Sequence, residues 1–184
     1  MSASFSYGQE KAKIKGLSFV GSSTPIDKKD VNPIVAINAN WVTLMPYGFI
    51  GANGKVSFNS EWQWWGEKVE GIEKTVELCK AAGLKIMLKP QIWMRNEYTG
   101  NFKLSTEKEW GIFEQSYEDF ISAILAVAIE HDVELFCIGT EWREFVKARP
   151  PFWNNLISET KKNITALCSG RLPKATSLFW CGNL

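Results

Sequence analysis

The sequence is poor in histidine and has no excess charge of either sign. Its 184 residues include one His, 21 Lys and Arg, and 20 Asp and Glu, which gives a formal net charge of +1. This balance provides no electrostatic attraction to nucleic acid, so nucleic acid is not an expected partner. One His and four Cys without a CxxC pair also argue against a structural zinc site, and no metal or cofactor is expected.

Long apolar segments are also missing. No run approaches the ~20 residues of a membrane-spanning helix, and residues 1–14 lack the apolar core of a signal peptide. We therefore expect no membrane span and, by default, a cytoplasmic location. The cysteines are widely spaced, which favours reduced core thiols over a disulfide framework at Cys79, Cys137, Cys168 and Cys181.

Short apolar runs and longer helical patterns alternate along the chain. The apolar runs, which are typical of strands in a parallel sheet, lie at 14–20, 41–45, 84–88 and 133–138. The helical patterns lie at 27–37, 67–82, 106–131 and from Pro150 onward. This order predicts an α/β domain whose parallel strands are adjacent in chain order, with helices on the outer side. A doubly wound sheet and half of an eight-fold barrel both fit the pattern.

Two helix ends carry recognisable signals. Thr106 followed by Glu109 is a capping-box pattern, and Gly83 fits the position just past a helix end. The helix at 106–131 is predicted to bury one apolar stripe, made of Trp110, Phe113, Tyr117, Phe120, Ile121, Ile124 and Ala128.

The motifs of several enzyme classes are absent. The segment 21–25 after the first strand lacks the three glycines of a dinucleotide-binding loop, and no GxxxxGK[ST] or GxSxG motif occurs. His131 stands at a predicted helix end, where a surface role is favoured over a catalytic one. The sequence therefore does not support nucleotide binding or serine hydrolase chemistry.

The clearest site signal follows the fourth strand, where Gly139, Thr140, Glu141 and Trp142 succeed one another. A carboxylate at this place lies at the carboxyl end of the sheet, where α/β proteins build their sites. Apolar neighbours can raise the pKa of such a Glu and make it a proton donor near neutral pH. A Glu that only caps or salt-bridges the following turn is the alternative.

Aromatic and amide side chains gather after the second and third strands. Lys89 and Gln91 alternate toward one face and Trp93 follows, while residues 47–65 form an aromatic-rich loop among the nine Trp of the chain. Such rings beside amide and hydroxyl groups suit a sugar surface, and a hydrophobic cluster beneath a long loop is the alternative. The candidates for a sugar-binding wall on or beside these strand ends are Trp41, Tyr47, Lys89, Gln91 and Trp93.

Four motifs in order resemble glycoside hydrolase family 113, a family of β-mannanase-like TIM-barrel enzymes in clan A. They lie at 62–67, 86–93, 136–141 and 149–153, and the resemblance covers residues 13–167. It implies the N-terminal half of a (β/α)8 barrel, an oligo- or polysaccharide substrate such as β-mannan, and no cofactor. It also implies that Glu141 is the acid/base of a retaining mechanism, with Thr140 and Trp142 beside it as further sugar contacts.

The sequence departs from the family pattern in two places. Thr140 stands where the clan commonly has Asn, which puts the usual contact to the sugar 2-hydroxyl in doubt. Residues 169–184 do not resemble a fifth strand, because Pro173 falls where a central strand needs an N–H donor. We therefore expect residues 1–184 to form a single incomplete barrel domain, produced by a shifted frame or truncated gene, or a genuine half-barrel.

Three functions fit these observations. The chain is the N-terminal half of a retaining glycoside hydrolase, a non-catalytic carbohydrate-binding relic, or an unrelated α/β enzyme. In the first case we expect it to be inactive alone, because the clan's nucleophile follows a seventh strand. The open edges of a half-barrel sheet are further expected to favour self-association.

Overall fold

The computed structural model describes residues 13–95 and 97–163. Its main sheet has four strands in the order β1-β2-β5-β7, and every neighbouring pair is parallel. These strands are β1 (Gly16–Phe19), β2 (Trp41–Leu44), β5 (Lys85–Leu88) and β7 (Leu135–Phe136). The predicted adjacency of four parallel strands in chain order is therefore confirmed. The outermost strands of the described sheet are β1 and β7, and self-association through their edges stays a prediction.

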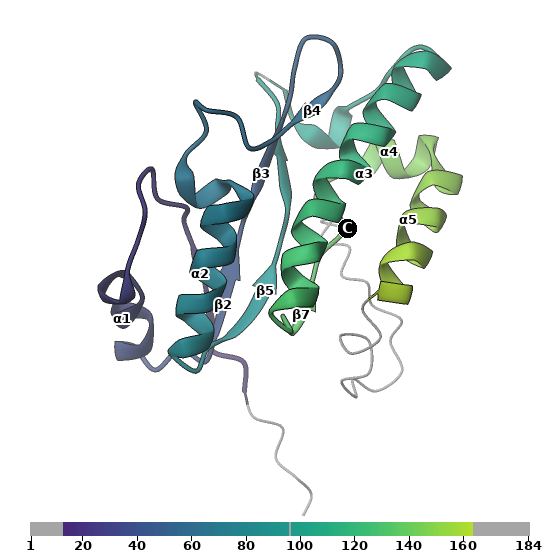
Figure 1. The fold of residues 1–184 in the computed structure, drawn as a ribbon. Helices are drawn as coiled ribbons and strands as arrows, with labels where there is room; N and C mark the ends of the chain where they lie inside the picture. The colour runs from purple at the N-terminus through teal and green to yellow at the C-terminus, as the bar shows by residue number, and fades with distance from the viewer. Residues whose placement is uncertain (1–12, 96, 164–184) are drawn as a thin grey trace, which may run out of the picture.

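Burial alternates along the central strands. Val42, Leu44, Ile86 and Leu88 are buried, whereas their neighbours on the other face of the sheet are at least partly accessible. Figure 1 shows α2 (Val69–Ala81) and α3 (Glu107–Glu130) side by side over one face. In the described residues the helices thus cover only one face of the sheet. This arrangement excludes the doubly wound alternative and agrees with the predicted placement of the helices on the outer side.

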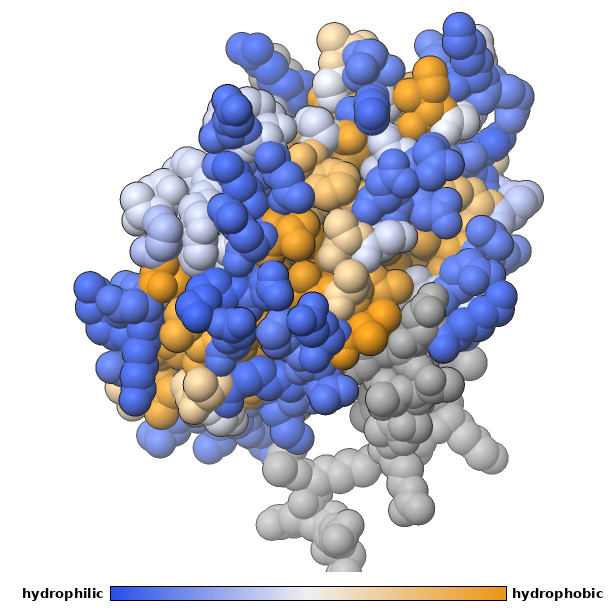
Figure 2. Space-filling view, viewed as in Figure 1, coloured by the Kyte–Doolittle hydropathy of each residue, from blue (hydrophilic) through white to orange (hydrophobic). Residues whose placement is uncertain are grey.

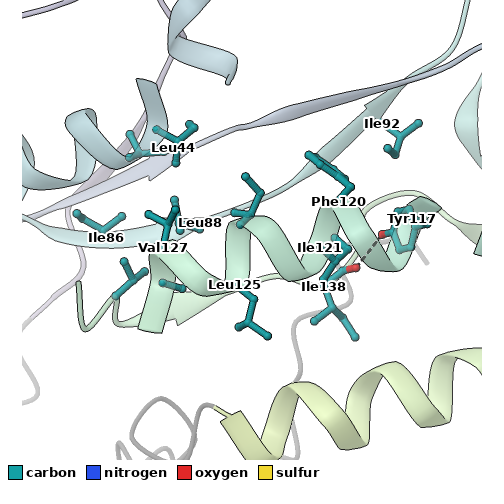
Figure 3. Close-up of a cluster of buried hydrophobic side chains, with 14 of the residues drawn as sticks. Leu44, Ile86, Leu88, Ile92, Tyr117, Phe120, Ile121, Leu125, Val127 and Ile138 are labelled. Atoms are coloured by element: carbon teal, nitrogen blue, oxygen red, sulfur yellow. Dashed lines mark hydrogen bonds between the residues drawn. The ribbon is translucent and has the colours of Figure 1, made fainter. Parts of the chain in front are cut away.

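Capping residues mark the ends of several helices. Asp27 caps α1 (Lys28–Ala36) with a complete capping box, and Thr106 caps α3 in the same way through Glu109. Gly83 follows α2 with φ +78°, a conformation that favours glycine. The whole predicted stripe of α3 is buried, from Trp110 to Ala128. Figure 3 shows α3 facing the strands across the core: Val127 lies beside Leu88, and Phe120 lies toward Ile92.

A second, smaller sheet stands where the sequence predicts loops. It contains β3 (Tyr47–Ile50), β4 (Val56–Ser57) and β6 (Gln91–Trp93) in the order β4-β3-β6. Pro46 and Pro90 end the pairing of β2 and β5 in the main sheet. Directly after each proline, the backbone continues into a strand of the second sheet. The N–H of Gln91 donates to the carbonyl of Pro46 at 2.9 Å, so the two continuations pair again beyond the prolines.

The fourth β/α unit also differs from expectation. The paired part of its strand is only β7, shorter than the predicted 133–138, and a short helix α4 (Arg143–Ala148) precedes α5 (Pro150–Asn163). Cys79 and Cys137 are buried in the core as predicted. Cys168, Cys181 and the tail 169–184 lie outside the described residues.

The outer surface of the helices is mostly hydrophilic, with apolar side chains between the hydrophilic ones (Figure 2). Within the part of the chain that the structure describes, no helix is long and apolar enough to cross a membrane.

Candidate active site

The register of the second sheet places three of the predicted site residues on one face. Tyr47 pairs with Gln91, and Phe49 pairs with Trp93, so alternate residues of β3 and β6 project to the same side. The phenol oxygen of Tyr47 lies 3.5 Å from Oε1 of Gln91. The opposite face packs inward, since a Cβ at Gly48 would come within 2.7 Å of Ile92. Tyr47, Gln91 and Trp93 therefore share the side that the helices do not cover.

Exposed aromatic rings border these residues. The ring of Phe49 meets Trp62 edge to face at 4.7 Å between centroids and lies 6.0 Å from the ring of Trp93. Trp62 is 64% exposed and Trp93 is 50% exposed, unusual values for such large apolar side chains. We call Phe49, Trp62 and Trp93 the aromatic rim. Exposed rings held by mutual contacts offer flat apolar surfaces on which a ligand can stack.

Glu141 follows β7 in a strained backbone conformation. Its side chain is exposed and its φ is +61°, a left-handed value that costs a non-glycine residue about 1–2 kcal/mol. The N–H of Arg143 donates to the carbonyl of Glu141 at 2.9 Å and closes the turn that holds it. Strain of this kind is concentrated at functional sites, where the surrounding structure enforces it.

A buried aromatic cluster supports this turn. The hydroxyl of Tyr117 donates to the carbonyl of Ile138 at 2.7 Å and accepts from Nε1 of Trp142 at 3.0 Å. Gly139 is enclosed by rings, because a Cβ there would lie 2.7 Å from Trp153. These contacts fix the path of the chain from the end of β7 to Glu141.

Two predicted sugar contacts prove to be buried side chains. Trp142 is only 1% exposed and packs edge to face against Phe113 and Tyr117, so its indole is a core side chain that cannot stack on a sugar. The prediction for Trp142 is wrong, because side chains of the α3 stripe surround the ring and leave no face of it open to a ligand. Thr140, directly before Glu141, is also buried, at 6% exposure.

Trp41 is placed at the wrong end of its strand for the predicted wall. It is the first residue of β2, and its ring lies 5.8 Å from the ammonium of Lys85. Tyr47 lies six residues further on, roughly 20 Å along an extended chain. Lys89 is half-buried, with its backbone N–H bound to the carbonyl of Leu44, and it precedes Gln91 by two residues on the same face.

Glu67 joins the site although the sequence pattern assigns it to the start of a helix. Burial raises the pKa of its carboxyl, and burial together with the charges of Glu67 and Glu141 raises the pKa of the Tyr47 phenol. Both carboxylates thus lie near the same phenol. The residue belongs to a 3₁₀ turn, η1 (Trp65–Glu67), that precedes α2.

One group of potential metal ligands lies elsewhere. Within the described residues, ligand atoms of Glu73, Glu130 and His131 come within 4.8 Å of one another. They stand on α2 and at the carboxyl end of α3, at the opposite edge of the sheet from Glu141. Exposed acidic groups are common without a bound ion, and these residues bring no chemistry to the candidate site.

Comparisons with known proteins agree with this geometry. Two solved structures of β-1,4-mannanases of family 113, one described as a complex, each align at 20% identity and a TM-score of 0.66, over 82% of this chain and 52% of theirs. A family 113 β-mannanase from Alicyclobacillus acidocaldarius aligns at 24% identity and a TM-score of 0.67, over 82% of this chain and 51% of its own. These likenesses show the fold, the N-terminal half of a TIM barrel. No protein of curated function matches the chain.

The chain spans about half the length of the solved structures that it matches. The sequence profile described as Glycoside Hydrolase Family 113 matches residues 21–173, far more than half of the chain. The chain therefore belongs to glycoside hydrolase family 113.

Proposed function

We propose that this chain supplies the proton-transferring half of a retaining glycosidase site, with Glu141 as acid/base. The observation that supports the proposal is the shared position of Glu141 and Tyr47, since the charge of that carboxylate reaches the phenol beside Gln91. A carboxyl group at the carboxyl end of a barrel strand is where TIM-barrel enzymes hold their catalytic residues.

The chemistry assigned to Glu141 has two steps. As an acid it gives its proton to the glycosidic oxygen while a second carboxylate attacks the anomeric carbon, so that the leaving sugar departs as an alcohol. As a base it then takes a proton from the water that releases the covalently bound sugar. A retaining pair needs its carboxyl groups about 5–5.5 Å apart on opposite sides of the bond.

The substrate that we propose is a β-linked polysaccharide such as β-mannan. The aromatic rim offers stacking surfaces for sugar rings, and Tyr47 and Gln91 offer a hydroxyl and an amide for hydrogen bonds to sugar hydroxyls. The family profile and the structural likeness to β-1,4-mannanases point to the same substrate class.

We further propose that residues 1–184 alone hydrolyse no glycoside. Among the described carboxylates, Glu144 is bound to Lys103, Arg143 and Lys147, and Glu134 is bound to Lys80 at the amino end of β7. Neither is placed as the nucleophile of Glu141. The attacking carboxylate is assigned to a later β/α unit of a complete barrel.

A non-catalytic carbohydrate-binding protein is the second candidate. The exposure of Trp62, Trp64 and Trp93 favours it, because rings at the surface can bind saccharides without a second carboxylate. Both candidates predict saccharide binding, and only the first predicts that Glu141 takes part in turnover once the barrel is complete.

The test combines binding with complementation. The purified chain is titrated with manno-oligosaccharides by tryptophan fluorescence and calorimetry, and hydrolysis of an aryl β-mannoside is followed in parallel. We expect binding without turnover. Co-expression with the four C-terminal β/α units of a family 113 mannanase should then give turnover that falls at least 100-fold in Glu141→Gln.

Glu144→Gln is the matched control, because that carboxylate lies one helical turn away in ion pairs and should leave the restored rate unchanged. Turnover that is insensitive to Glu141→Gln would overturn the acid/base assignment. A folded chain that binds no saccharide would overturn the proposed site altogether.

A further inference from the structure

The starting observation is the position of Glu67 at the carboxyl end of β1. The N–H of Gly66 donates to the carbonyl of Ser22 at 2.7 Å, which ties η1 to the segment that leaves β1. A Cβ at Gly21 would lie 3.1 Å from Cγ of Glu67, so the stem of this Glu rests on a glycine. Residues 66–67 are therefore fixed at the same edge of the sheet as the rest of the site.

A buried amide connects this turn to Tyr47. Gln63 is 5% exposed, and its Nε2 donates to the carbonyl of Tyr47 at 2.7 Å and to that of Glu67 at 3.4 Å. One side chain thus binds the backbone of both residues. It sets the spacing between the strand that carries the phenol and the turn that carries the carboxylate.

The usual structural roles of a half-buried Glu do not apply here. Among residues 13–95 and 97–163, the Glu67 carboxylate forms no ion pair or hydrogen bond, and burial alone raises its pKa. It does not cap α2 either, because the first N–H of that helix, on Val69, donates to Oδ1 of Asn59 at 2.9 Å. A carboxylate that burial has partly removed from water, without compensation, costs stability.

Two carboxylates therefore flank one phenol. The charges of Glu67 and Glu141 both act on Tyr47, with Glu67 toward β1 and Glu141 toward β7. A carboxylate offers only acceptors, and a saccharide hydroxyl is a donor that can satisfy it. A saccharide bound against Tyr47 would thus come into the neighbourhood of Glu67, whose turn Gln63 holds beside that residue.

We propose that Glu67 is a further substrate-contacting residue, whose carboxylate accepts hydrogen bonds from hydroxyls of the saccharide that Tyr47 also contacts. The inference rests on the proposed function. It assigns Glu67 to recognition and not to proton transfer, and it gives a functional reason for an uncompensated carboxylate at this position, since functional residues often cost stability.

The test measures binding and stability in the same variants. Manno-oligosaccharide affinity and thermal unfolding are compared for the unchanged chain, Glu67→Gln, Glu67→Ala and the control Glu70→Gln. Glu70 is an exposed carboxylate three residues away, in the first turn of α2. We expect Glu67→Ala to weaken binding about tenfold and Glu67→Gln less, because a hydrogen bond to a charged group is lost or weakened.

The two readouts separate the possible outcomes. Weaker binding with unchanged or increased thermal stability in Glu67→Gln supports the inference, because a merely structural carboxylate would lose stability when its charge is removed. Unchanged binding in both variants overturns it, and so does a parallel loss of binding and stability. A folded, unsubstituted chain that binds no saccharide overturns the proposed function first and this inference with it.

Discussion

Tyr47 and Gln91 stand directly opposite each other in β3 and β6, with 3.5 Å between the phenol oxygen and the amide Oε1. Each residue follows a proline-interrupted strand of the main sheet. The pair is thus set by the register of the second sheet, and each side chain limits the orientation of the other.

This pairing predicts coupled effects on saccharide binding. Tyr47→Phe and Gln91→Ala should each weaken manno-oligosaccharide affinity about three- to tenfold, as expected for one hydrogen bond. The double variant should lose less than the sum of the two free energies, since neighbouring groups that share a partner are not additive. Calorimetric titration of the four proteins measures the coupling, with exposed Gln115→Ala on α3 as control. Strict additivity would show that the two side chains act independently.

Gly139 should not tolerate a side chain. Its Cβ would lie 2.7 Å from Trp153 and 3.0 Å from the Tyr117 hydroxyl, so Gly139→Ala should destabilise the chain by about 1–3 kcal/mol through overpacking. Gly111→Ala in α3 is the matched control, because nothing lies within 4 Å of its added Cβ. That substitution should stabilise the helix by about 0.5–1 kcal/mol. Chemical denaturation measures both, and equal effects would contradict the packing argument.

The hydroxyl of Tyr117 should matter for stability. Tyr117→Phe removes a donor from the carbonyl of Ile138 and an acceptor from Nε1 of Trp142, both in a buried cluster. Leaving such groups unsatisfied should cost about 1–3 kcal/mol in the free energy of unfolding. Tyr98→Phe, at a half-exposed ring, should stay within about 0.5 kcal/mol of the unchanged chain. A loss no larger than that of Tyr98→Phe would mean that the buried hydrogen bonds contribute nothing.

The capping box of α3 should contribute a pH-dependent part of the stability. Hydrogen bonds from the Thr106 side chain and backbone, and then from the Ser105 N–H, lower the pKa of the Glu109 carboxyl. A lowered pKa stabilises the fold above the carboxyl's ordinary pKa, and that contribution disappears as the pH falls through the lowered value. Glu109→Gln should therefore reduce stability at neutral pH and make little difference in strong acid.

Glu118→Gln on the same helix is the control for this pH dependence. Thermal unfolding of the three proteins between neutral and strongly acidic pH gives the comparison. A Glu109→Gln effect that stays constant across this range would show that the carboxylate charge is not involved.

The sequence predicted the main sheet and its covering helices because periodicity and caps decide them locally. The α3 stripe and the cap at Thr106 both follow from residues three or four positions apart. The second sheet could not be predicted in this way, because Pro46 and Pro90 look like strand ends and the new pairing forms between segments far apart in the chain.

The errors at the site have the same origin. Trp142 was expected to face a sugar because it follows Glu141, but contacts with α3 decide its burial. The local pattern places Glu67 at a helix start, because the residues that hold its turn, Gly21 beside Glu67 and Ser22 bound to Gly66, lie more than forty residues earlier. Local pattern does not encode such contacts, whereas the position of Glu141 after a strand does follow from local pattern.

Pro46 and Pro90 affect how freely the sequence of the exposed side of the second sheet can vary. Each ends the continuous ladder of a main strand, so the residues beyond them are anchored mainly on the inward face, where the buried side chain of Ile92 packs against the bare backbone of Gly48. Phe49 and Trp93 on the opposite side can be replaced without altering that anchor or the strands beneath it. The aromatic rim can therefore vary while the barrel strands beneath it stay the same. On the proposed function, single substitutions there would change the preferred saccharide and leave folding intact.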